Sequence, residues 1–561
     1  MKTIKIINNQ LIIKIPYDIE LVSLIKTSFS GRQWDSNNKI WKAPVNEKNI
    51  LATYSLTTYH GFVISSDTLP IIEKYKEQFE EDRKEADVKI AASKAIDANI
   101  EIPNSLKGEL FPFQKAGVQF IENCNGKALI ADEPGLGKTV QAIAWSLLHP
   151  EKVPILVICP KTLMINWERE FQKWANIKAY RINSKDTNLR YIKGIDTYII
   201  NYDIVEKMKD LLKKMNFQII ILDESTAIKN PKAKRTKAIN EFIKGIPHIL
   251  ALTGTPTLNS RPIEMYTTLK MLSPINFGNY FEFVNKFCGA HRTRWGMDVS
   301  GATNIAELSD KLRSTVMIRR SKKDVLTELP DKTRVIIPQI CDLKQYKKVE
   351  DDLISYLIES KNRSKLQAER ISQVEALAKI EYLKQEAVKA KLPLFIEFVK
   401  DFMENDKKLV IFGHHREFIE RLMIELKEFN PVKIMGGMSS EEKQKSIDSF
   451  QTNKNCKIFI GSITSAGVGI TLTEASHMVF LELMFVPGLH DQAEDRINRI
   501  GQKNACTIYY FIADETIEQD IFNLLQSKRK VFQELMQDTN TVIENIDTNI
   551  LNDLINKLTD K

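Results

Sequence analysis

The chain has 561 residues, of which 43% are apolar and 27% charged, and this composition excludes a disordered chain. A chain of this length exceeds what one hydrophobic core supports, so we expect several domains. The net charge of +8 is a weak indication of a polyanionic partner such as nucleic acid.

The sequence does not resemble that of a membrane protein, a secreted protein or a small domain held together by zinc or disulfides. It contains no run of 18 apolar residues, and its start lacks the pattern of a signal peptide. The six cysteines are scattered without a CxxC pair, which argues against a zinc knuckle or a disulfide framework. We therefore expect a cytoplasmic protein, from a bacterium or a bacteriophage-infected cell, without a membrane partner.

The chain begins with a small α+β unit and a charged segment. Residues 1–57 carry short alternating apolar stretches and two tryptophans, Trp34 and Trp41, which flank a polar turn. Residues 58–104 are rich in Lys and Glu with few apolar anchors, which predicts an exposed helical linker.

The remainder predicts two α/β blocks. Short apolar runs alternate with amphipathic helical stretches, a pattern typical of parallel sheets that are buried on both faces. The first block has such runs at Ala128–Ala131, Ile155–Cys159, Thr197–Ile200, Ile219–Leu222 and Ile249–Leu252. The second has them at Leu409–Phe412, Lys457–Ile460, His477–Leu481 and Thr507–Phe511. The predicted boundaries are a first lobe at 105–335, a helical insertion at 336–403, a second lobe at 404–515 and a helical C-terminal brace at 516–561.

The sharpest signal is Asp132-Glu-Pro-Gly-Leu-Gly-Lys-Thr139, which lies between an apolar run and a helical run. Its glycines let a loop bend so that backbone N–H groups face phosphate oxygens, and a helix amino terminus adds positive potential. Lys138 then reaches the β- and γ-phosphates, and Thr139 holds Mg²⁺. The general pattern has glycine where this chain has Asp132, and a plain glycine turn is the alternative.

A second candidate is Ile219-Ile-Ile-Leu-Asp-Glu-Ser-Thr226, an apolar strand that ends in two carboxylates. At the carboxyl edge of a sheet, Asp223 can bind Mg²⁺, and Glu224 can orient and deprotonate an attacking water. A solvated Asp-Glu turn is the alternative, which the phosphate loop upstream disfavours.

A third candidate is Gln492-Ala-Glu-Asp-Arg496-Ile-Asn-Arg499-Ile-Gly-Gln502. Arginines three residues apart lie on one face of a helix, and a surface ion-pair helix is the alternative. A partner lobe that inserts Arg496 and Arg499 would supply the positive charge that phosphoryl transfer requires.

Together these segments resemble the Swi/Snf family of superfamily 2 helicase-like ATPases. The resemblance covers residues 105–530 as an ordered set of motifs. The further matching segments are Leu110–Gln114, Leu156–Thr162 with Asn166-Trp167, Asn201–Asp203, Asp223–Asn230, Leu252–Pro256 with Asn259, Arg319-Arg320, Val410–His415 and Gly461–Thr473.

The resemblance implies two RecA-like lobes that bind MgATP between them and duplex DNA across both. It adds Gln114 as the residue that reads adenine, Gly135, Gly137 and Gly469 as nucleotide contacts, and Gln492 as a catalytic residue beside Lys138, Asp223, Glu224, Arg496 and Arg499. It also implies DNA contacts by Lys161, Thr162, Asn201, His414, Thr464 and Phe485.

Two positions depart from the family pattern. Thr226 stands where the family has His, which puts the coupling between nucleotide state and motion in doubt. Phe485 stands where Trp is typical, and it can still stack on DNA.

Residues 1–57 resemble the HARP domain of annealing helicases, which implies that Trp34 and Trp41 bind DNA. A small domain that uses both rings as core is the alternative.

The sequence thus predicts a DNA-dependent ATPase that acts as a monomeric duplex translocase on double-stranded or forked DNA, including single-strand/duplex junctions, with fork remodelling or strand annealing as its task. One alternative is a motor that displaces proteins such as RNA polymerase from DNA. Another is a nucleotide-gated DNA-binding scaffold with little hydrolysis. The sequence does not indicate the protein partners.

Overall fold

The computed structural model describes residues 2–186, 190–293, 296–326, 328–362, 366–467, 469–536 and 558, without the side chains of residues 358–374. It divides into two compact units, Met1–Ala91 and Ala92–Lys561. Within these described ranges, no helix is long and apolar enough to cross a bilayer.

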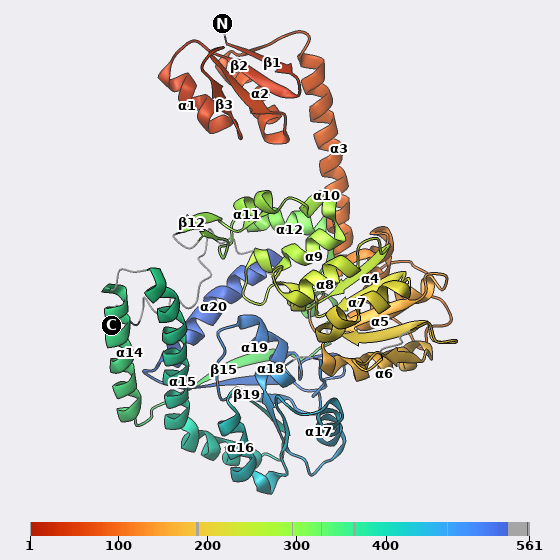
Figure 1. Ribbon diagram of the computed structural model, residues 1–561, viewed down its shortest axis with the longest axis vertical. Helices are drawn as coiled ribbons and strands as arrows, with labels where there is room; N and C mark the ends of the chain where they lie inside the picture. Colours follow the sequence, from red (N-terminus) through yellow and green to blue (C-terminus); the bar gives the residue numbers. More distant parts are fainter. Residues whose placement is uncertain are drawn as a thin grey trace. The chain divides into compact units, whose positions relative to one another are not determined.

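The first unit is a five-stranded sheet in the order β3-β4-β2-β1-β5 with helices α1 and α2 (Figure 1). Its elements are β1 (Thr3–Ile7), β2 (Gln10–Lys14), α1 (Ile19–Ser28), β3 (Gln33–Asp35), β4 (Ile40–Pro44), α2 (Glu47–His60), β5 (Val63–Ile64) and α3 (Leu69–Ser93). The predicted boundary at residue 57 falls inside α2, and β5 extends the sheet by pairing with β1. The small domain is therefore larger than its sequence pattern indicated.

The second unit contains two lobes (Figure 1). Lobe one has a seven-stranded sheet in the order β14-β6-β11-β10-β7-β9-β8, and all its paired strands are parallel. The strands are β6 (Lys127–Ile130), β7 (Ile155–Cys159), β8 (Ala179–Arg181), β9 (Thr197–Asn201), β10 (Ile219–Asp223), β11 (His248–Leu252) and β14 (Met317–Ile318). The principal helices are α4 (Pro112–Asn123), α5 (Lys138–Leu148), α6 (Met164–Ala175), α7 (Val205–Lys214), α8 (Lys234–Phe242), α9 (Tyr266–Leu272), α11 (Tyr280–Phe287) and α12 (Ile305–Arg313).

Lobe two has a six-stranded parallel sheet in the order β15-β20-β19-β16-β18-β17. The strands are β15 (Lys332–Gln339), β16 (Leu409–Gly413), β17 (Val432–Ile434), β18 (Ile458–Ser462), β19 (His477–Phe480) and β20 (Cys506–Ala513). The helices are α14 (Lys344–Asn362), α15 (Leu366–Met403), α16 (Arg416–Glu425), α17 (Ser440–Thr452), α18 (Ile463–Ala466), α19 (Pro487–Glu494) and α20 (Ile517–Met536). The predicted fold class, two tandem RecA-like lobes with a helical insertion and a small α+β domain, is confirmed.

The structure moves two of the predicted boundaries in this unit. Strand β15 pairs with β20, so lobe two begins near residue 332 rather than after the helical insertion. Of the predicted brace, α20 is described, whereas residues 537–557 and 559–561 lie outside the described residues.

Helix α20 joins the cores of the two lobes. Phe522, Leu524 and Leu525, in its first half, belong to the hydrophobic core of lobe two. Val531 and Leu535, near its end, belong to the core of lobe one, and α20 packs there against α12 (Figure 1). This last helix of the described lobes is therefore a structural part of both.

Candidate active site

The loop between β6 and α5 bends at two glycines with positive φ, Gly135 (95°) and Gly137 (79°). A Cβ atom at Gly135 would lie 2.7 Å from the Cβ of Arg499, and one at Gly137 would lie 2.4 Å from Nε2 of Gln114. Both positions therefore require glycine for the backbone conformation and for the close approach of a neighbouring segment. The loop leads directly into the amino terminus of α5, where Lys138 is the first residue.

Lys138 is held against this loop, where its Nζ donates a hydrogen bond to the backbone oxygen of Asp132 (2.8 Å). Burial lowers the pKa of Lys138 to about 8, and the nearby carboxylates of Glu224, Asp132 and Asp223 oppose that shift. An anion bound beside Lys138 would favour its charged form further.

The two carboxylates at the end of β10 face this lysine. The indole Nε1 of Trp167 donates to Asp223 (2.7 Å), and the hydroxyl of Thr253 donates to Glu224 (3.4 Å). Glu224 has a φ of 49°, a left-handed conformation that is uncommon outside glycine and that occurs at functional sites.

Burial raises the pKa of Glu224 to about 7, and the charge of neighbouring Asp223 adds to this effect. A carboxylate with a pKa near neutrality is suited to accept a proton from water. Burial also raises the pKa of Asp223.

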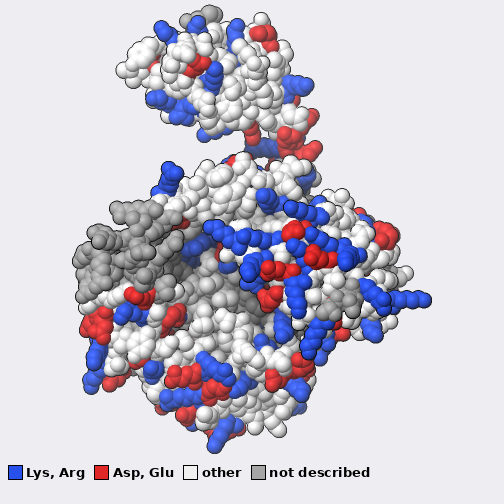
Figure 2. Space-filling model, viewed as in Figure 1, with Lys and Arg blue, Asp and Glu red and all other residues white. Residues whose placement is uncertain are grey.

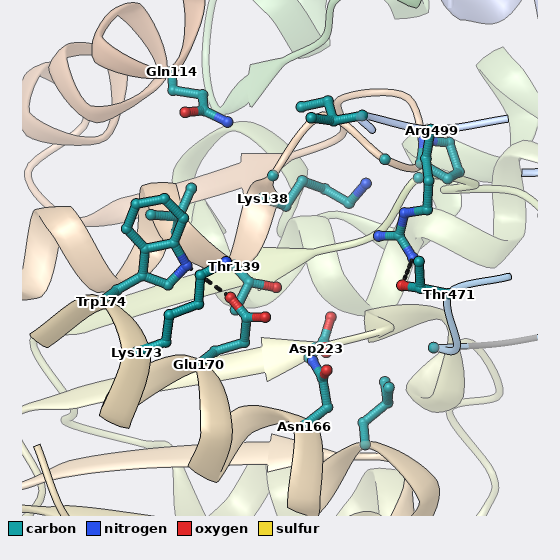
Figure 3. Close-up of a pocket in the computed structure, with 18 of the residues that line it drawn as sticks. Gln114, Lys138, Thr139, Asn166, Glu170, Lys173, Trp174, Asp223, Thr471 and Arg499 are labelled. Carbon is teal, nitrogen blue, oxygen red and sulfur yellow. Dashed lines mark hydrogen bonds between the residues drawn. The ribbon is translucent and has the colours of Figure 1, made fainter. Parts of the chain in front are cut away.

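The two arginines come from lobe two. Helix α19 ends at Glu494, so Arg496 and Arg499 lie in the turn that follows, residues 495–499, rather than on a helix face as predicted. We call this segment the arginine turn. Arg499 donates to the hydroxyl of Thr471 (2.8 Å; Figure 3) and to the carbonyl of Ile470 (3.0 Å). Burial lowers the pKa of Arg499 to about 10, with a further contribution from the charge of Arg496.

These groups surround one cavity of about 440 Å³ between the two lobes. Figure 3 shows Lys138, Asp223 and Arg499 converging on it, with Gln114 and Trp174 near its other end. The predicted residues that line the cavity are Gln114, Gly135, Gly137, Lys138, Thr139, Asp223, Glu224, Gly469, Arg496 and Arg499. Phe111 and Asn166, from the matching segments, line it too, and so do Glu170, Lys173 and Trp174, which the sequence did not single out.

Gln114 retains hydrogen-bonding capacity for a ligand. Its Oε1 accepts a hydrogen bond from the backbone N–H of Phe111 (3.1 Å), and its Nε2 donates to the carbonyl of Leu136 (3.2 Å). A carboxamide has two N–H groups and two lone pairs, so one donor and one acceptor remain. This is the pair that the edge of an adenine base requires.

The donor set of the cavity fits Mg²⁺. The Thr139 hydroxyl and the Asp223 carboxylate are oxygen donors that line it together. Across the residues that the structure describes, no three His, Cys, Asp or Glu side chains gather as a metal cage. Mg²⁺ is usually held by one or two carboxylates together with water and substrate phosphates, so two protein oxygens suffice.

Gln492 lies behind this cavity rather than in its wall. It is buried, and its Nε2 donates to the hydroxyl of Thr255. Because Gln492 comes from lobe two and Thr255 from lobe one, the bond joins the lobes. The geometry supports a linking role rather than contact with the reacting groups.

Sequence reasoning missed the partner of Asp132. The side chains of Asp132 and Arg320 are both buried and form an ion pair, in which Arg320 Nε donates to Asp132 Oδ1 (2.9 Å). Gln141 donates to the other carboxylate oxygen (3.0 Å). Two features of the sequence could have indicated this ion pair: Asp132 at a position where the loop pattern has glycine, and the adjacent arginines Arg319-Arg320. Asp132 thus fixes the start of the phosphate loop.

The side chains predicted to contact DNA differ in their exposure to solvent. Lys161 and Thr464 are exposed, and Thr162 and His414 are half-buried. Asn201 is buried, and its side chain accepts a hydrogen bond from the backbone N–H of Asp203. Asn201 is therefore a capping residue, and its DNA contact stays a prediction.

Phe485 is engaged within lobe two. The ammonium of Lys384, on α15, lies 4.4 Å from the centroid of its ring, a cation–π geometry. Because one ring face is occupied by Lys384, Phe485 has at most its other face for a base.

The two tryptophans of the first unit also differ. Trp34 and Trp41 are opposite one another in the predicted hairpin of β3 and β4, with ring centroids 5.1 Å apart. Trp41 is 9% exposed and belongs to the core of the unit, whereas Trp34 is 49% exposed. The burial of Trp41 favours the alternative that this ring belongs to the core, and its DNA contact stays a prediction.

Exposed lysines and arginines gather on lobe one. Figure 2 shows a broad group of Lys and Arg side chains on the face of the second unit in view. Exposed members on α7, α8 and the segment before α8 are Lys207, Lys213, Lys214, Lys232, Lys234, Arg235 and Lys237. The Lys-rich segment 320–323, in contrast, is partly internal, because Arg320 and Lys322 are buried in ion pairs.

Residues 113–389 match the model of the SNF2-related domain, and residues 390–501 match that of the helicase conserved C-terminal domain. The chain is 31% identical over 530 residues to the "SWI/SNF-related matrix-associated actin-dependent regulator of chromatin subfamily A-like protein 1" of Xenopus laevis, covering 92% of this chain and 53% of that protein. It is 33% identical over 455 residues to the human "DNA annealing helicase and endonuclease ZRANB3", covering 77% of this chain and 40% of that protein.

Among solved structures, the "Sulfolobus solfataricus SWI2/SNF2 ATPase core in complex with dsDNA" matches with a TM-score of 0.39 at 25% identity, covering 79% of this chain and 96% of that one. The chain spans about half the length of the Xenopus relative, or 53% of it.

Proposed function

Because the chain belongs to the SNF2 family of helicase-like ATPases, we propose that it is a DNA-dependent ATPase that translocates on duplex DNA and remodels it. One observation carries the proposal. A single cavity is lined by a phosphate loop and two carboxylates from lobe one and by two arginines from lobe two.

Each group in the cavity has a step that it is placed to perform on ATP. Lys138 and the N–H groups at the start of α5 bind the β- and γ-phosphates. Thr139 and Asp223 would hold Mg²⁺, which neutralises phosphate charge when bound. Glu224 takes a proton from the attacking water, for which its pKa of about 7 suits it.

Arg499 and Arg496 stabilise the charge that develops on the transferred phosphoryl group. Because they come from lobe two, hydrolysis depends on the closed arrangement of the lobes, and release of the products reopens them. Alternating closure of this kind can advance a motor along DNA when the grip of each lobe alternates.

The exposed basic side chains of α7 and α8 suit a phosphate backbone, which requires positive charge rather than base-specific contacts. They support duplex DNA as the partner. The names of the curated relatives support a task in annealing or remodelling DNA. The cation Mg²⁺ and the nucleotide ATP are the proposed cofactors.

The proposal predicts that ATP turnover depends on DNA. We expect slow hydrolysis without DNA, a rise of about tenfold or more with duplex DNA and a further rise with forked DNA, because DNA bound across both lobes favours their closed arrangement further. Steady-state phosphate release with single-stranded, duplex and forked substrates measures this. Tight ATP-dependent DNA binding with no turnover on any substrate would favour the scaffold alternative.

Trp34 is the proposed stacking residue of the first unit. Stacking a base on an exposed ring contributes roughly 1–3 kcal/mol. We expect Trp34→Ala to keep duplex-stimulated ATPase activity and to lose the preference for forked over plain duplex DNA. Tyr59→Ala is the matched control, because Tyr59 is 78% exposed on α2 of the same unit. An unchanged fork preference in a folded Trp34→Ala protein contradicts the stacking role.

A monomeric motor in the cytoplasm of a bacterial or phage-infected cell is also a proposal. The proposed location is supported by six cysteines that are all free thiols in the structure, which suits a reducing compartment. Light scattering in solution and fractionation of the host cell test these two points.

A further inference from the structure

Helix α19 and the arginine turn carry both arginines and carboxylates, and the two kinds of side chain have different neighbours. Arg496 and Arg499 line the nucleotide cavity. Asp491, Glu494 and Asp495 instead contact cations that do not line the cavity. Glu494 and Asp495 are 0% and 3% exposed, so their charges depend on these partners.

Four cations from three parts of the chain surround these carboxylates. Lys322, from lobe one, contacts Asp495 (2.6 Å), and Lys332, on β15, contacts Glu494 (3.0 Å). Arg334, also on β15, donates to both carboxylate oxygens of Glu494 (2.8 and 2.7 Å). We call this set the cation cradle; its members are Lys322, Lys332, Arg334 and Arg529.

Arg529 is the member of the cradle on α20. Its Nε donates to Asp491 (2.9 Å), and its Nη2 donates to the hydroxyl of Tyr510 (2.7 Å) and to Glu494 (3.3 Å). Tyr510 in turn donates to Glu494 (2.7 Å). One guanidinium thus fixes two carboxylates of α19 that lie one turn apart.

Arg529 lies where α20 passes from one lobe to the other. The hydroxyl of Ser260, in lobe one, donates to the carbonyl of Lys528, the residue before Arg529 (2.9 Å). Val531 and Leu535, just after it, are in the core of lobe one. The guanidinium therefore links α19 to a helix that is anchored in lobe one.

Arg529 and Glu494 remain charged in this buried setting, whereas burial raises the pKa of Asp491 against the opposing charge of Arg529. The surrounding cations hold the pKa of Glu494 well below its usual range despite burial. The carboxylates of Asp491 and Glu494 raise the pKa of Arg529 despite burial. The contact is thus a pair of full charges, which has strict geometric requirements.

We propose that Arg529 is a positioning residue for ATP hydrolysis, which holds α19 from behind so that the arginine turn presents Arg496 and Arg499 to the cavity. The inference rests on the proposed ATPase activity. It makes α20, beside Lys322 of lobe one, an element through which a change in the spacing of the two lobes shifts the catalytic arginines. Arg529 itself does not touch the cavity.

The test compares Arg529→Lys and Arg529→Met with Lys530→Met in the full chain. Lys530 is exposed on the same helix, so its variant removes one positive charge without touching α19. A misplacement of about 1 Å costs on the order of 10²-fold in rate, so we expect kcat to fall about 10²-fold for Met and about tenfold for Lys. We expect the KM for ATP to change less than about threefold in both variants, because the phosphate loop of lobe one is untouched, and Lys530→Met to behave like the wild type.

A double-mutant cycle with Arg499→Ala separates positioning from general damage. If Arg529 acts through the arginine turn, Arg529→Lys should have a smaller further effect once Arg499 is absent, because only Arg496 is then left to be displaced, as measured by single-turnover hydrolysis. Equal fold-losses in both backgrounds would overturn the proposal, as would an unchanged kcat in Arg529→Lys.

Thermal unfolding of each variant identifies any loss of fold, and the Lys variant keeps the buried charge if the Met variant does not fold. A wild-type protein that does not hydrolyse ATP would instead contradict the proposed function. The two failures are therefore distinguishable.

Discussion

Glu224→Gln is expected to bind ATP and fail to hydrolyse it. The substitution preserves the shape of the side chain and its contact with Thr253, but an amide cannot accept the proton of the attacking water. General bases contribute about 10²–10⁴-fold, so turnover should fall by at least that factor. Binding of a fluorescent ATP analogue and DNA-stimulated phosphate release measure the two properties.

Lys138→Ala provides the complementary result at the same site. It removes the cation beside the β- and γ-phosphates, so both ATP binding and turnover should be lost. For Glu224→Gln the matched control is Glu282→Gln, because Glu282 is an exposed carboxylate on α11 of the same lobe. Near-normal hydrolysis in Glu224→Gln or Lys138→Ala would contradict the assignment of the cavity as the ATP site.

Arg499→Ala is expected to leave ATP binding within a few-fold of normal and to lower kcat by roughly 10³-fold, the scale known for arginine fingers. The phosphate loop and the carboxylates belong to lobe one, so ground-state binding remains. Arg421→Ala is the control, because Arg421 is exposed on α16 of lobe two. Loss of ATP affinity with a normal kcat would make Arg499 a ground-state ligand instead.

The parallel sheets were predictable because their central strands carry an unambiguous signal. Strand β7 is buried along its whole length, and its residues read as one continuous apolar run. Strand β15 was missed, because it alternates between exposed and half-buried residues, contains Pro338 and lies at the edge of its sheet. Strands β8, β14 and β17 are only two or three residues long, too short for a periodic pattern.

The candidate site was predictable where function fixes a local pattern. The phosphate loop and the pair Asp223-Glu224 each lie within one short segment, so chemistry and sequence coincide. The cradle around Glu494 was not predictable, since Lys332 and Arg529 are far from it in sequence and meet it through the tertiary fold. Likewise, no pattern distinguishes buried Trp41 from exposed Trp34, because that difference depends on which strand lies at the edge.

The place of α20 has a consequence for biosynthesis. Val531 and Leu535 complete the core of lobe one, although the ribosome makes them after all of lobe two. Lobe one therefore cannot finish folding as a separate unit while the chain is growing, and an apolar surface stays exposed until α20 emerges. Such surfaces favour aggregation. Lobe one expressed alone should thus aggregate readily. A separately supplied α20 peptide should reduce this aggregation by covering the exposed apolar surface.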